Sequence, residues 1–263
     1  MKTDSAFPRR AWVEQVMGLP VSVHVRGAAA TSPAVQAAVG ELFASLHRVD
    51  ERFSTYRSDS EVSRLRRGEG GALSPELVEV LVRCDEARQR TRGAFDPNLP
   101  GGFDPSGLVK GWAVERAAEP LRAAAAGSDW LVNAGGDVLV HAVEGRAWNV
   151  AVEDPRRADR VVRTYALSSG AIATSGAARR GAHITDPATG RPAAAGLLSA
   201  TVLAPTLLWA DVYATAAYVR GLESLSWLGR LDGVRALLVR ADGSLVSTAP
   251  AAARPAQRVL VRL

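Results

Sequence analysis

The 263-residue chain has 47% hydrophobic and 22% charged residues, an ordinary composition for a globular protein with a substantial core. The basic residues behind its net charge of +5 are dispersed arginines with few aromatic neighbours, which indicates a compositional bias and no nucleic-acid partner. The single Cys84 excludes an internal disulfide, and its helical spacing from leucines predicts a core thiol. With no apolar N-terminal run, and no segment of roughly 20 apolar residues, we expect a cytoplasmic protein without a membrane segment.

The N-terminal part reads as one strand followed by three helices. Alternating valines at 21–25 predict a strand with one buried face. A serine and a proline open a helix over residues 32–53, and the same pair opens another over 74–92. Between them, Ser58 and Glu61 have capping-box spacing and predict the start of a short helix. Tyr56, in the turn before it, either plugs the edge of the core or stacks on a planar ligand.

The segment 93–117, GAFDPNLPGGFDPSGLVKGWAVERA, is the most unusual in the chain. It contains two Asp-Pro steps, at Asp96 and Asp104, with glycines between them that allow a close approach of backbone to a ligand. Lys110 is one of two lysines among 32 basic residues. A compact ammonium near helix-start N–H groups suits a phosphate, although a surface lysine beside a Gly-Pro loop is the alternative.

The rest of the chain is rich in predicted strands. Residues 129–140 read as a strand interrupted by Asn133–Asp137, where glycines indicate a bulge or a close backbone approach. Residues 171–192 read as loop-rich sequence that is too polar for a core. The other predicted elements are a helix at 106–126, strands at 148–155, 161–170 and 197–205, a helix at 207–221, a hairpin at 234–248 and a last strand at 257–263. No internal repeat is visible.

Asp211 and Thr215 are spaced i and i+4 on the helix 207–221, so they share one face. A carboxylate and a hydroxyl in this arrangement are oxygen ligands for a hard cation. Asp211 lies in an apolar run, where an uncompensated buried carboxylate is costly, and this favours a metal or another cation beside it. The alternative is that Thr215 bonds back to its own helix and that Asp211 caps a nearby element.

Eight motifs occur in an order that resembles the ApbE family of flavin transferases, the FAD:protein FMN transferases. They are Met17-Gly18, FSTYRSDSEVSRL (53–65), GAFDP (93–97), FDPSGLVKGWAVERA (103–117), NAGGD (133–137), ATSG (173–176), HITDPATGRP (183–192) and WADVYAT (209–215). The resemblance, which runs from about Met17 to Gly221, implies an α+β fold. It implies a single T-fold-like unit of two interleaved α/β lobes with the active site between them. We expect this domain at residues 17–263, after an N-terminal extension at 1–16.

The resemblance also implies roles for individual residues, matched position by position. The metal, Mg²⁺, is expected at the backbone carbonyl of Gly107 and at Asp211 and Thr215, with Ala214 close by. FAD is expected to contact Met17, Tyr56, Ala94, Phe95, Asp96, Asp104, Lys110 and Ile184, with the backbone of Asn133–Asp137 near the flavin or the diphosphate. His183 and Lys110 are expected to be catalytic, His183 either as the base or as a group that orients a phosphate.

The implied reaction moves FMN from FAD to a threonine of an acceptor protein and releases AMP. The acceptor carries a pattern such as Asp-Gly-x-Ser-Gly-Ala-Thr. With water in place of threonine, the same site is a Mg²⁺-dependent FAD diphosphatase that gives FMN and AMP. A flavin-binding protein without catalysis is the third possibility, and the presence of Lys110, His183, Asp211 and Thr215 together argues against it.

Overall fold

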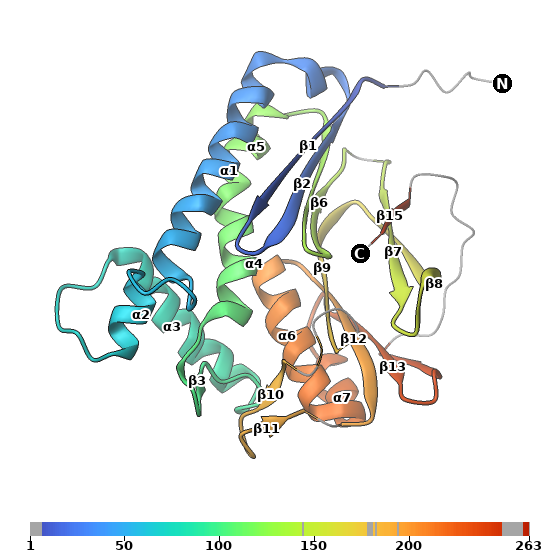
Figure 1. The fold of residues 1–263 in the computed structure, drawn as a ribbon. Helices are drawn as coiled ribbons and strands as arrows, with labels where there is room; N and C mark the ends of the chain where they lie inside the picture. Colours follow the sequence, from blue (N-terminus) through green and yellow to red (C-terminus); the bar gives the residue numbers. More distant parts are fainter. Residues whose placement is uncertain are drawn as a thin grey trace.

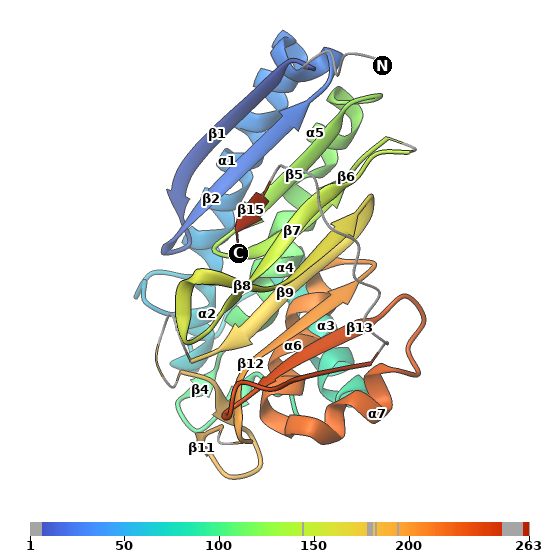
Figure 2. The same cartoon turned by 90° about the vertical axis from the view of Figure 1, so that its right-hand side faces the viewer.

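The computed structural model describes residues 7–143, 145–177, 181, 183–193, 195–248 and 260–262. In these residues an eight-stranded sheet, ordered β1-β2-β5-β6-β9-β12-β13-β14, forms the central layer. Figure 1 shows the helices on one face of this sheet and a small sheet, ordered β15-β7-β8, on the other. Figure 2, turned by 90°, shows the strands of the main sheet side by side, with β7 and β8 in front of them.

The main sheet consists of β1 (Arg9–Val16), β2 (Leu19–Arg26), β5 (Asp129–Ala134), β6 (Asp137–His141), β9 (Ser169–Gly176), β12 (Leu197–Ala204), β13 (Arg235–Arg240) and β14 (Leu245–Ser247). The small sheet consists of β7 (Trp148–Asp154), β8 (Arg157–Leu167) and β15 (Leu260–Arg262). Two short hairpins pair β3 (Asn98–Leu99) with β4 (Gly102–Phe103), and β10 (Thr185–Asp186) with β11 (Arg191–Pro192). The helices are η1 (Ala28–Thr31), α1 (Pro33–Phe53), α2 (Glu61–Arg66), α3 (Pro75–Arg90), α4 (Ser106–Ala117), α5 (Glu119–Ala124), α6 (Leu207–Arg220), η2 (Gly221–Glu223) and α7 (Ser224–Leu228).

Both faces of the central strands are buried, each in a different core. On β5, Trp130 and Val132 belong to the larger core between sheet and helices, whereas Leu131 belongs to a smaller core against β7 and β8. Successive strand residues point to opposite faces, so a strand covered on both sides contains a continuous apolar run. This explains why the sequence WLV carries no polar alternation.

The main sheet is built from two halves with the same path. In the N-terminal half, residues 9–141, the β1–β2 hairpin is followed by helices and then by the β5–β6 hairpin. In the C-terminal half, residues 169–247, β9 and β12 are followed by α6 and α7 and then by β13 and β14. Pairing of β6 with β9 joins the halves into one sheet. The repeat that the sequence did not reveal therefore exists in the topology.

Most of the predicted helices are confirmed, with one difference in capping. Ser32 and Ser74 cap α1 and α3, where their side chains accept hydrogen bonds from Val35 N and Leu77 N. The cap of α2 is Ser60 rather than Ser58, because the Ser60 side chain accepts from Ser63 N. The Glu61 carboxylate instead accepts from the backbone N and the hydroxyl of Ser74, so it ties the start of α3 to α2.

Three predicted segments differ from the structure. The interrupted strand at 129–140 is a hairpin, in which Gly135 (φ 63°) and Gly136 (φ 111°) form the turn between β5 and β6. The helix expected over 106–126 ends at Ala117, and α5 begins at Glu119. The loop-rich reading of 171–192 is wrong for its first residues, because β9 is a central strand whose Ile172 is fully buried.

Two further predictions from the sequence concern residues 9–16 and Cys84. Residues 9–16, which we assigned to an N-terminal extension, form the edge strand β1 and pair with β2 along its whole length. Cys84 is buried in the larger core, as predicted. Burial raises the pKa of its thiol to about 12, with the charges of Asp96 and Asp104 adding to the effect, so this thiol stays protonated and is a packing residue.

Candidate functional site

A cavity of about 220 Å³ opens at one end of the main sheet, where the β5–β6 turn, the end of β9 and the start of β12 come together. It lies between the helix layer, which contributes Lys110, and the small sheet, which contributes residues of β7 and β8. Its lining comprises Lys110, Gly135–Asp137, Val152–Pro155, Ala158, Thr174–Gly176, His183, Leu198 and Ser199. Both predicted catalytic residues therefore face the same cavity.

A larger hollow of about 700 Å³ lies at the opposite end of the same strands. It is lined by the end of β6, the start of β9 and the end of β12, together with charged residues of α4 and α5. None of the residues predicted to be catalytic, to bind FAD or to bind metal lines it. We therefore place the candidate site in the smaller cavity.

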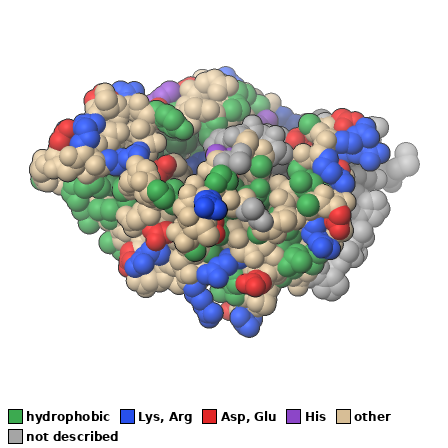
Figure 3. Space-filling model, turned by 60° about the horizontal axis from the view of Figure 1, so that its bottom comes forward, with side chains coloured by type: hydrophobic (Ala, Val, Ile, Leu, Met, Phe, Trp, Pro, Cys, Tyr) green, Lys and Arg blue, Asp and Glu red, His purple; other side chains and the backbone are tan. Residues whose placement is uncertain are grey.

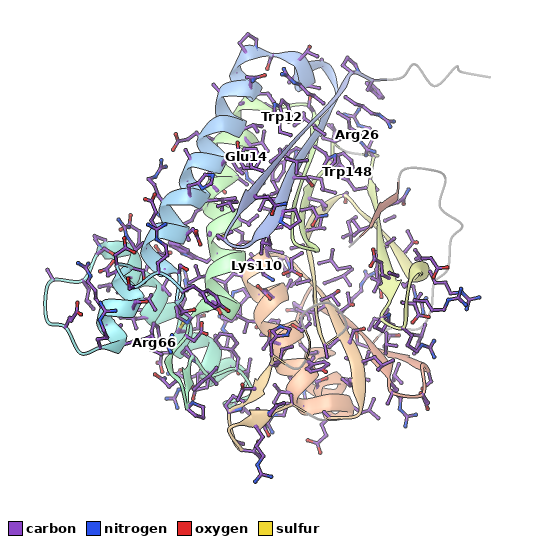
Figure 4. The ribbon with its side chains drawn as sticks, in the orientation of Figure 1. Trp12, Glu14, Arg26, Arg66, Lys110 and Trp148 are labelled. Atoms are coloured by element: carbon purple, nitrogen blue, oxygen red, sulfur yellow. The ribbon has the colours of Figure 1, made fainter. Side chains whose placement is uncertain are left out.

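Charged side chains from both halves meet beside this cavity. The Lys110 ammonium, on α4, contacts the Asp137 carboxylate at the start of β6. Its Nζ also lies 3.4 Å from Asp211 Oδ2 on α6. Both carboxylates are almost fully buried. Figure 4 shows Lys110 near the middle of the molecule, where α4 passes beside α6.

The hydroxyl and amide groups around these charges are arranged by strand register. Pairing of β6 with β9 ends at Val138 and Ile172, while β9 continues to Gly176. The N–H of Thr174 donates to Asp137 Oδ1 at 3.0 Å, which fixes that carboxylate. One residue further, Ser175 Oγ lies 3.1 Å from Thr215 Oγ1 on α6. The residues of β9 that extend beyond β6 thus connect the Asp137 carboxylate with α6, the helix that is expected to bind the metal.

The site has a donor set that fits a divalent cation. Two buried carboxylates, Asp137 and Asp211, lie beside the Lys110 ammonium, and carboxylate oxygens are ligands for a hard divalent cation. Thr215 adds a hydroxyl one turn beyond Asp211. Among the described residues no three His, Cys, Asp or Glu side chains form a metal cluster by themselves. A cation here would depend on hydroxyl and carbonyl oxygens as well, which are the ligands that Mg²⁺ prefers.

Gly107 lies in the first turn of α4. Glu115 on α4 contacts Leu207 at the start of α6, and Lys110, which comes earlier on α4, contacts Asp211 further along α6. The two helices therefore run antiparallel. Gly107 is a further turn back on α4, so it lies beyond Lys110 in the direction of the later turns of α6. A Cβ built on Gly107 would lie 3.2 Å from the Phe95 ring, so the GAFDP loop packs on the first turn of α4. Ala214 is fully buried on α6.

His183 is exposed at the rim of the cavity, and Ile184 beside it is half-buried against the larger core. His183 Nδ1 lies 2.9 Å from the Gly181 carbonyl oxygen. If Nδ1 donates this hydrogen bond, Nε2 is the acceptor nitrogen of the ring. An orientation of this kind leaves one ring nitrogen available to accept a proton from another molecule.

Met17 occupies a backbone conformation that is uncommon for its residue type. It forms the β1–β2 turn with Gly18, and its φ of 55° lies in the left-handed region. The strand after this turn packs on the glycine turn of the cavity, since Gly135 N donates to Pro20 O at 3.0 Å. The turn therefore lies close to the glycine turn that lines the cavity, and the FAD contact expected for Met17 stays a prediction.

The GAFDP loop and the second Asp-Pro step frame the start of α4. Ala94 and Phe95 are buried in the larger core. Asp96 Oδ1 accepts from Asn98 N at 2.8 Å, and Asp104 Oδ1 accepts from Ser106 N at 3.0 Å. Both aspartates thus close turns on either side of the β3–β4 hairpin, and Asp104 supports the first turn of the helix that carries Lys110.

Tyr56 is the one predicted site residue that the structure leaves isolated among the residues described. Its side chain is 97% exposed in the loop between α1 and α2. It therefore does not plug the core edge, and the reading in which it contacts a planar ligand stays a prediction. Exposure of a large aromatic ring is compatible with such a contact.

From the sequence, only the backbone of Asn133–Asp137 was expected near the ligand. The carboxylate of Asp137 and the hydroxyl of Ser175 were not predicted to be part of the site. Asp137 is buried and bonds to Lys110 and to Thr174 N. A signal existed in the sequence, because an acidic residue directly before the buried strand VLV requires a partner. Ser175 carried no such signal, since its contact with Thr215 depends on the position of β9 beside α6.

The fold and site together define an α+β protein with a charged cavity between two halves of one sheet. The ApbE family model matches residues 17–101 and 98–238, so the chain belongs to the ApbE family. This confirms the resemblance that the eight motifs indicated.

Similar proteins and structures agree with this assignment. The FAD:protein FMN transferase of Haemophilus influenzae is 26% identical, over 81% of this chain and 81% of its own. The FAD:protein FMN transferase of Vibrio cholerae is 28% identical, over 68% of this chain and 72% of its own. The structure of the ApbE protein from Thermotoga maritima superposes with a TM-score of 0.80 at 23% identity, covering 91% of this chain and 96% of that one. The predicted α+β fold is therefore confirmed.

Proposed function

We propose that this protein is an FAD:protein FMN transferase, which moves FMN from FAD to a threonine hydroxyl of an acceptor protein and releases AMP. The observation that carries the proposal is the cluster of Lys110, Asp137 and Asp211 beside a cavity that also contains His183. The relatives named above bear the same activity in their names. The acceptor is expected to carry a pattern such as Asp-Gly-x-Ser-Gly-Ala-Thr.

Asp211, Thr215 and the carbonyl of Gly107 are the groups that would hold Mg²⁺, with Ala214 beside them. When bound, Mg²⁺ supplies charge neutralisation at the FAD diphosphate and fixes its orientation. Lys110 supports this from the N-terminal half, because its ammonium reaches the same pair of carboxylates. A rotatable ammonium at that position stabilises negative charge that develops on the diphosphate as AMP leaves.

His183 is the residue that we assign as the base for the acceptor threonine. The threonine hydroxyl must lose its proton as it attacks the FMN-side phosphorus, and an imidazole with a lone pair on one ring nitrogen can accept that proton. The hydrogen bond between Nδ1 and Gly181 O favours Nε2 as the proton acceptor. Exposure of His183 at the cavity rim leaves this nitrogen accessible to a protein segment that enters from outside.

The basic side chains on the face shown in Figure 3 do not form the patch that is typical of a nucleic-acid-binding surface. On the face shown in Figure 3, Lys and Arg side chains are scattered among acidic and apolar ones and do not gather into a stripe. None of the helices in the described part of the chain is long and apolar enough to cross a membrane. Neither observation indicates where in the cell the acceptor is located.

The deciding experiment incubates the purified protein with FAD, Mg²⁺ and a protein acceptor that contains the threonine pattern. Mass spectrometry should show the acceptor heavier by one FMN moiety, with AMP formed in equal amount. His183→Ala should slow this step more than it weakens FAD binding, because a base acts in the transition state. Free FMN with an unmodified acceptor would identify a diphosphatase instead. Absence of both FMN and AMP would identify a flavin-binding protein without catalysis.

A further inference from the structure

Helices α4 and α6 approach each other unusually closely at Gly111. A Cβ built on this residue would lie 2.8 Å from the Leu207 carbonyl oxygen and equally close to Leu208 N and Cα. These are backbone atoms, which cannot move aside as the end of a flexible side chain can. Any side chain at position 111 would therefore push α6 away from α4, so glycine at this position sets the distance between the helices.

One turn further along α4, Glu115 binds the start of α6. Its Oε1 accepts from Leu207 N at 2.6 Å, and the N–H of Leu208 also donates to this carboxylate. The first N–H groups of a helix have no partner within the helix, and a negative charge there also interacts favourably with the helix dipole. Thr206, the N-cap residue of α6, accepts from Trp209 N. The beginning of α6 is thus held by a side chain from the other half of the molecule.

The contacted residues of α6 follow one face of the helix. Leu207, Asp211 and Thr215 are spaced four residues apart, and they meet Glu115, Lys110 and Ser175 respectively. A shift or rotation of α6 at its first turn therefore moves the other two residues relative to their partners. Because an interhelical displacement of about 1 Å can cost 100-fold in rate, this contact bears directly on the site.

We infer that Gly111 and Glu115 are positioning residues that fix α6 against α4 and so hold Asp211 and Thr215 in register with Lys110. The inference rests on the proposed function only in taking Asp211 and Thr215 as metal ligands. Neither Gly111 nor Glu115 was singled out by the sequence, and neither lines the cavity. They act through the helix that they hold and touch no reacting atom.

The test uses Glu115→Ala and Glu115→Gln, with Glu119→Ala as the matched control. Glu119 is an exposed glutamate at the start of α5, next to the same region. Three quantities are measured: affinity for Mn²⁺ in the presence of FAD by electron paramagnetic resonance, the kcat and KM of FMN transfer, and hydrogen exchange of the amides at 207–210. Melting temperatures establish that each variant is folded.

Glu115→Ala should weaken Mn²⁺ binding by about tenfold, as expected when a residue that supports metal ligands is lost. It should also speed hydrogen exchange at 207–210 and lower kcat more than it changes the KM for FAD. Glu115→Gln keeps an acceptor oxygen and should recover most of the Mn²⁺ affinity. Glu119→Ala should resemble the unmodified protein.

Gly111→Ala is a second, independent way to displace α6 from α4. Gly40→Ala is its matched control, because Gly40 is a helical glycine on α1 with open space where a Cβ would stand. We expect kcat to fall roughly 100-fold for Gly111→Ala and to stay unchanged for Gly40→Ala.

The outcomes separate this inference from the proposed function. If the unmodified protein neither turns over FAD nor binds Mn²⁺ with FAD, the proposed function fails. If the unmodified protein is active but Glu115→Ala only lowers the melting temperature, with Mn²⁺ affinity and kcat unchanged, Glu115 is a simple helix cap and the inference is overturned. Should Gly111→Ala fail to fold, the two Glu115 variants still decide the question.

Discussion

The two halves of the main sheet share a path but contribute different things to the site. In the N-terminal half the connection between its hairpins contains α1–α5 and both Asp-Pro loops, whereas in the C-terminal half it contains only α6, η2 and α7. Each half supplies one buried carboxylate, Asp137 or Asp211, and Lys110 of the larger half lies between them.

This difference suggests a division of roles within one sheet. The long connection of the N-terminal half can enclose a large ligand such as FAD, since its loops carry most of the predicted contacts. The short connection of the C-terminal half places α6 directly behind β9 and β12, where its position is set by packing on both sides. We therefore expect metal binding to depend most on Asp211 and Thr215 of the C-terminal half, with the Gly107 carbonyl and Asp137 of the N-terminal half in supporting roles, and flavin binding to depend most on the N-terminal half.

The largest effect is expected from Asp211→Ala in the C-terminal half. Loss of metal-supported charge stabilisation of about 4 kcal/mol corresponds to a roughly 1,000-fold drop in FAD turnover. The protein should stay folded, because Lys110 keeps its contact with Asp137. The rate of FMN transfer at saturating Mg²⁺ and the melting temperature are the measurements. Unmodified rates in the variant, or full activity of the unmodified protein in excess chelator, would contradict the metal assignment.

A smaller effect is expected from Asp137→Asn in the N-terminal half. The amide oxygen can still accept from Thr174 N, but the negative charge that holds Lys110 is lost. Lys110 then competes with the cation for Asp211, so the Mg²⁺ concentration for half-maximal activity should rise about tenfold. Asp159→Asn, which removes one charge from an exposed part of β8, is the control and should have no such effect. An unchanged Mg²⁺ requirement in Asp137→Asn would show that the charge of Asp137 does not influence the metal site.

Tyr56→Ala tests the flavin-binding role of the N-terminal half. Because the side chain is 97% exposed, its removal should leave the melting temperature unchanged. If the ring stacks on FAD, affinity measured by flavin fluorescence should fall by about tenfold, while the metal requirement stays the same. Val82→Ala, at an exposed position of α3, is the matched control. Equal FAD affinity in both variants would remove Tyr56 from the site.

The smallest expected effect is on the pH dependence of the melting temperature, through the Glu115 contact between the two halves. Burial raises the pKa of Glu115, against the opposing effect of the Leu207 and Leu208 N–H groups and of Arg122, with Glu119 adding to the increase. A carboxyl whose folded pKa is raised stabilises the fold most below its unfolded value of 4.5, and this contribution is lost as pH rises through the folded value. The melting temperature of the unmodified protein should therefore rise relative to that of Glu115→Gln as pH falls from neutrality towards 4.5. A difference that is independent of pH would show that Glu115 has an ordinary pKa.

Much of this molecule could be predicted from local patterns in the sequence. The helix starts at Ser32 and Ser74 depend on side chains within three residues, so local signals sufficed for them. The shared face of Asp211 and Thr215 follows from helical periodicity alone, and the ordered motifs identified the family and its fold.

Other features were decided only by tertiary structure. The polar sequence ATSG is the end of a central strand, β9, because β12 pairs with it after β6 has paired with the residues before it, and pairing partners distant in sequence leave no local trace. The two halves also share an order of strands and helices, which is a feature of the topology that the residue pattern does not reveal. The clearest case is the meeting of Lys110 with Asp137 and Asp211, residues from two helices and a strand. Their proximity depends on the close approach at Gly111, because a long-range charge cluster exists only once packing has fixed the distance between its elements.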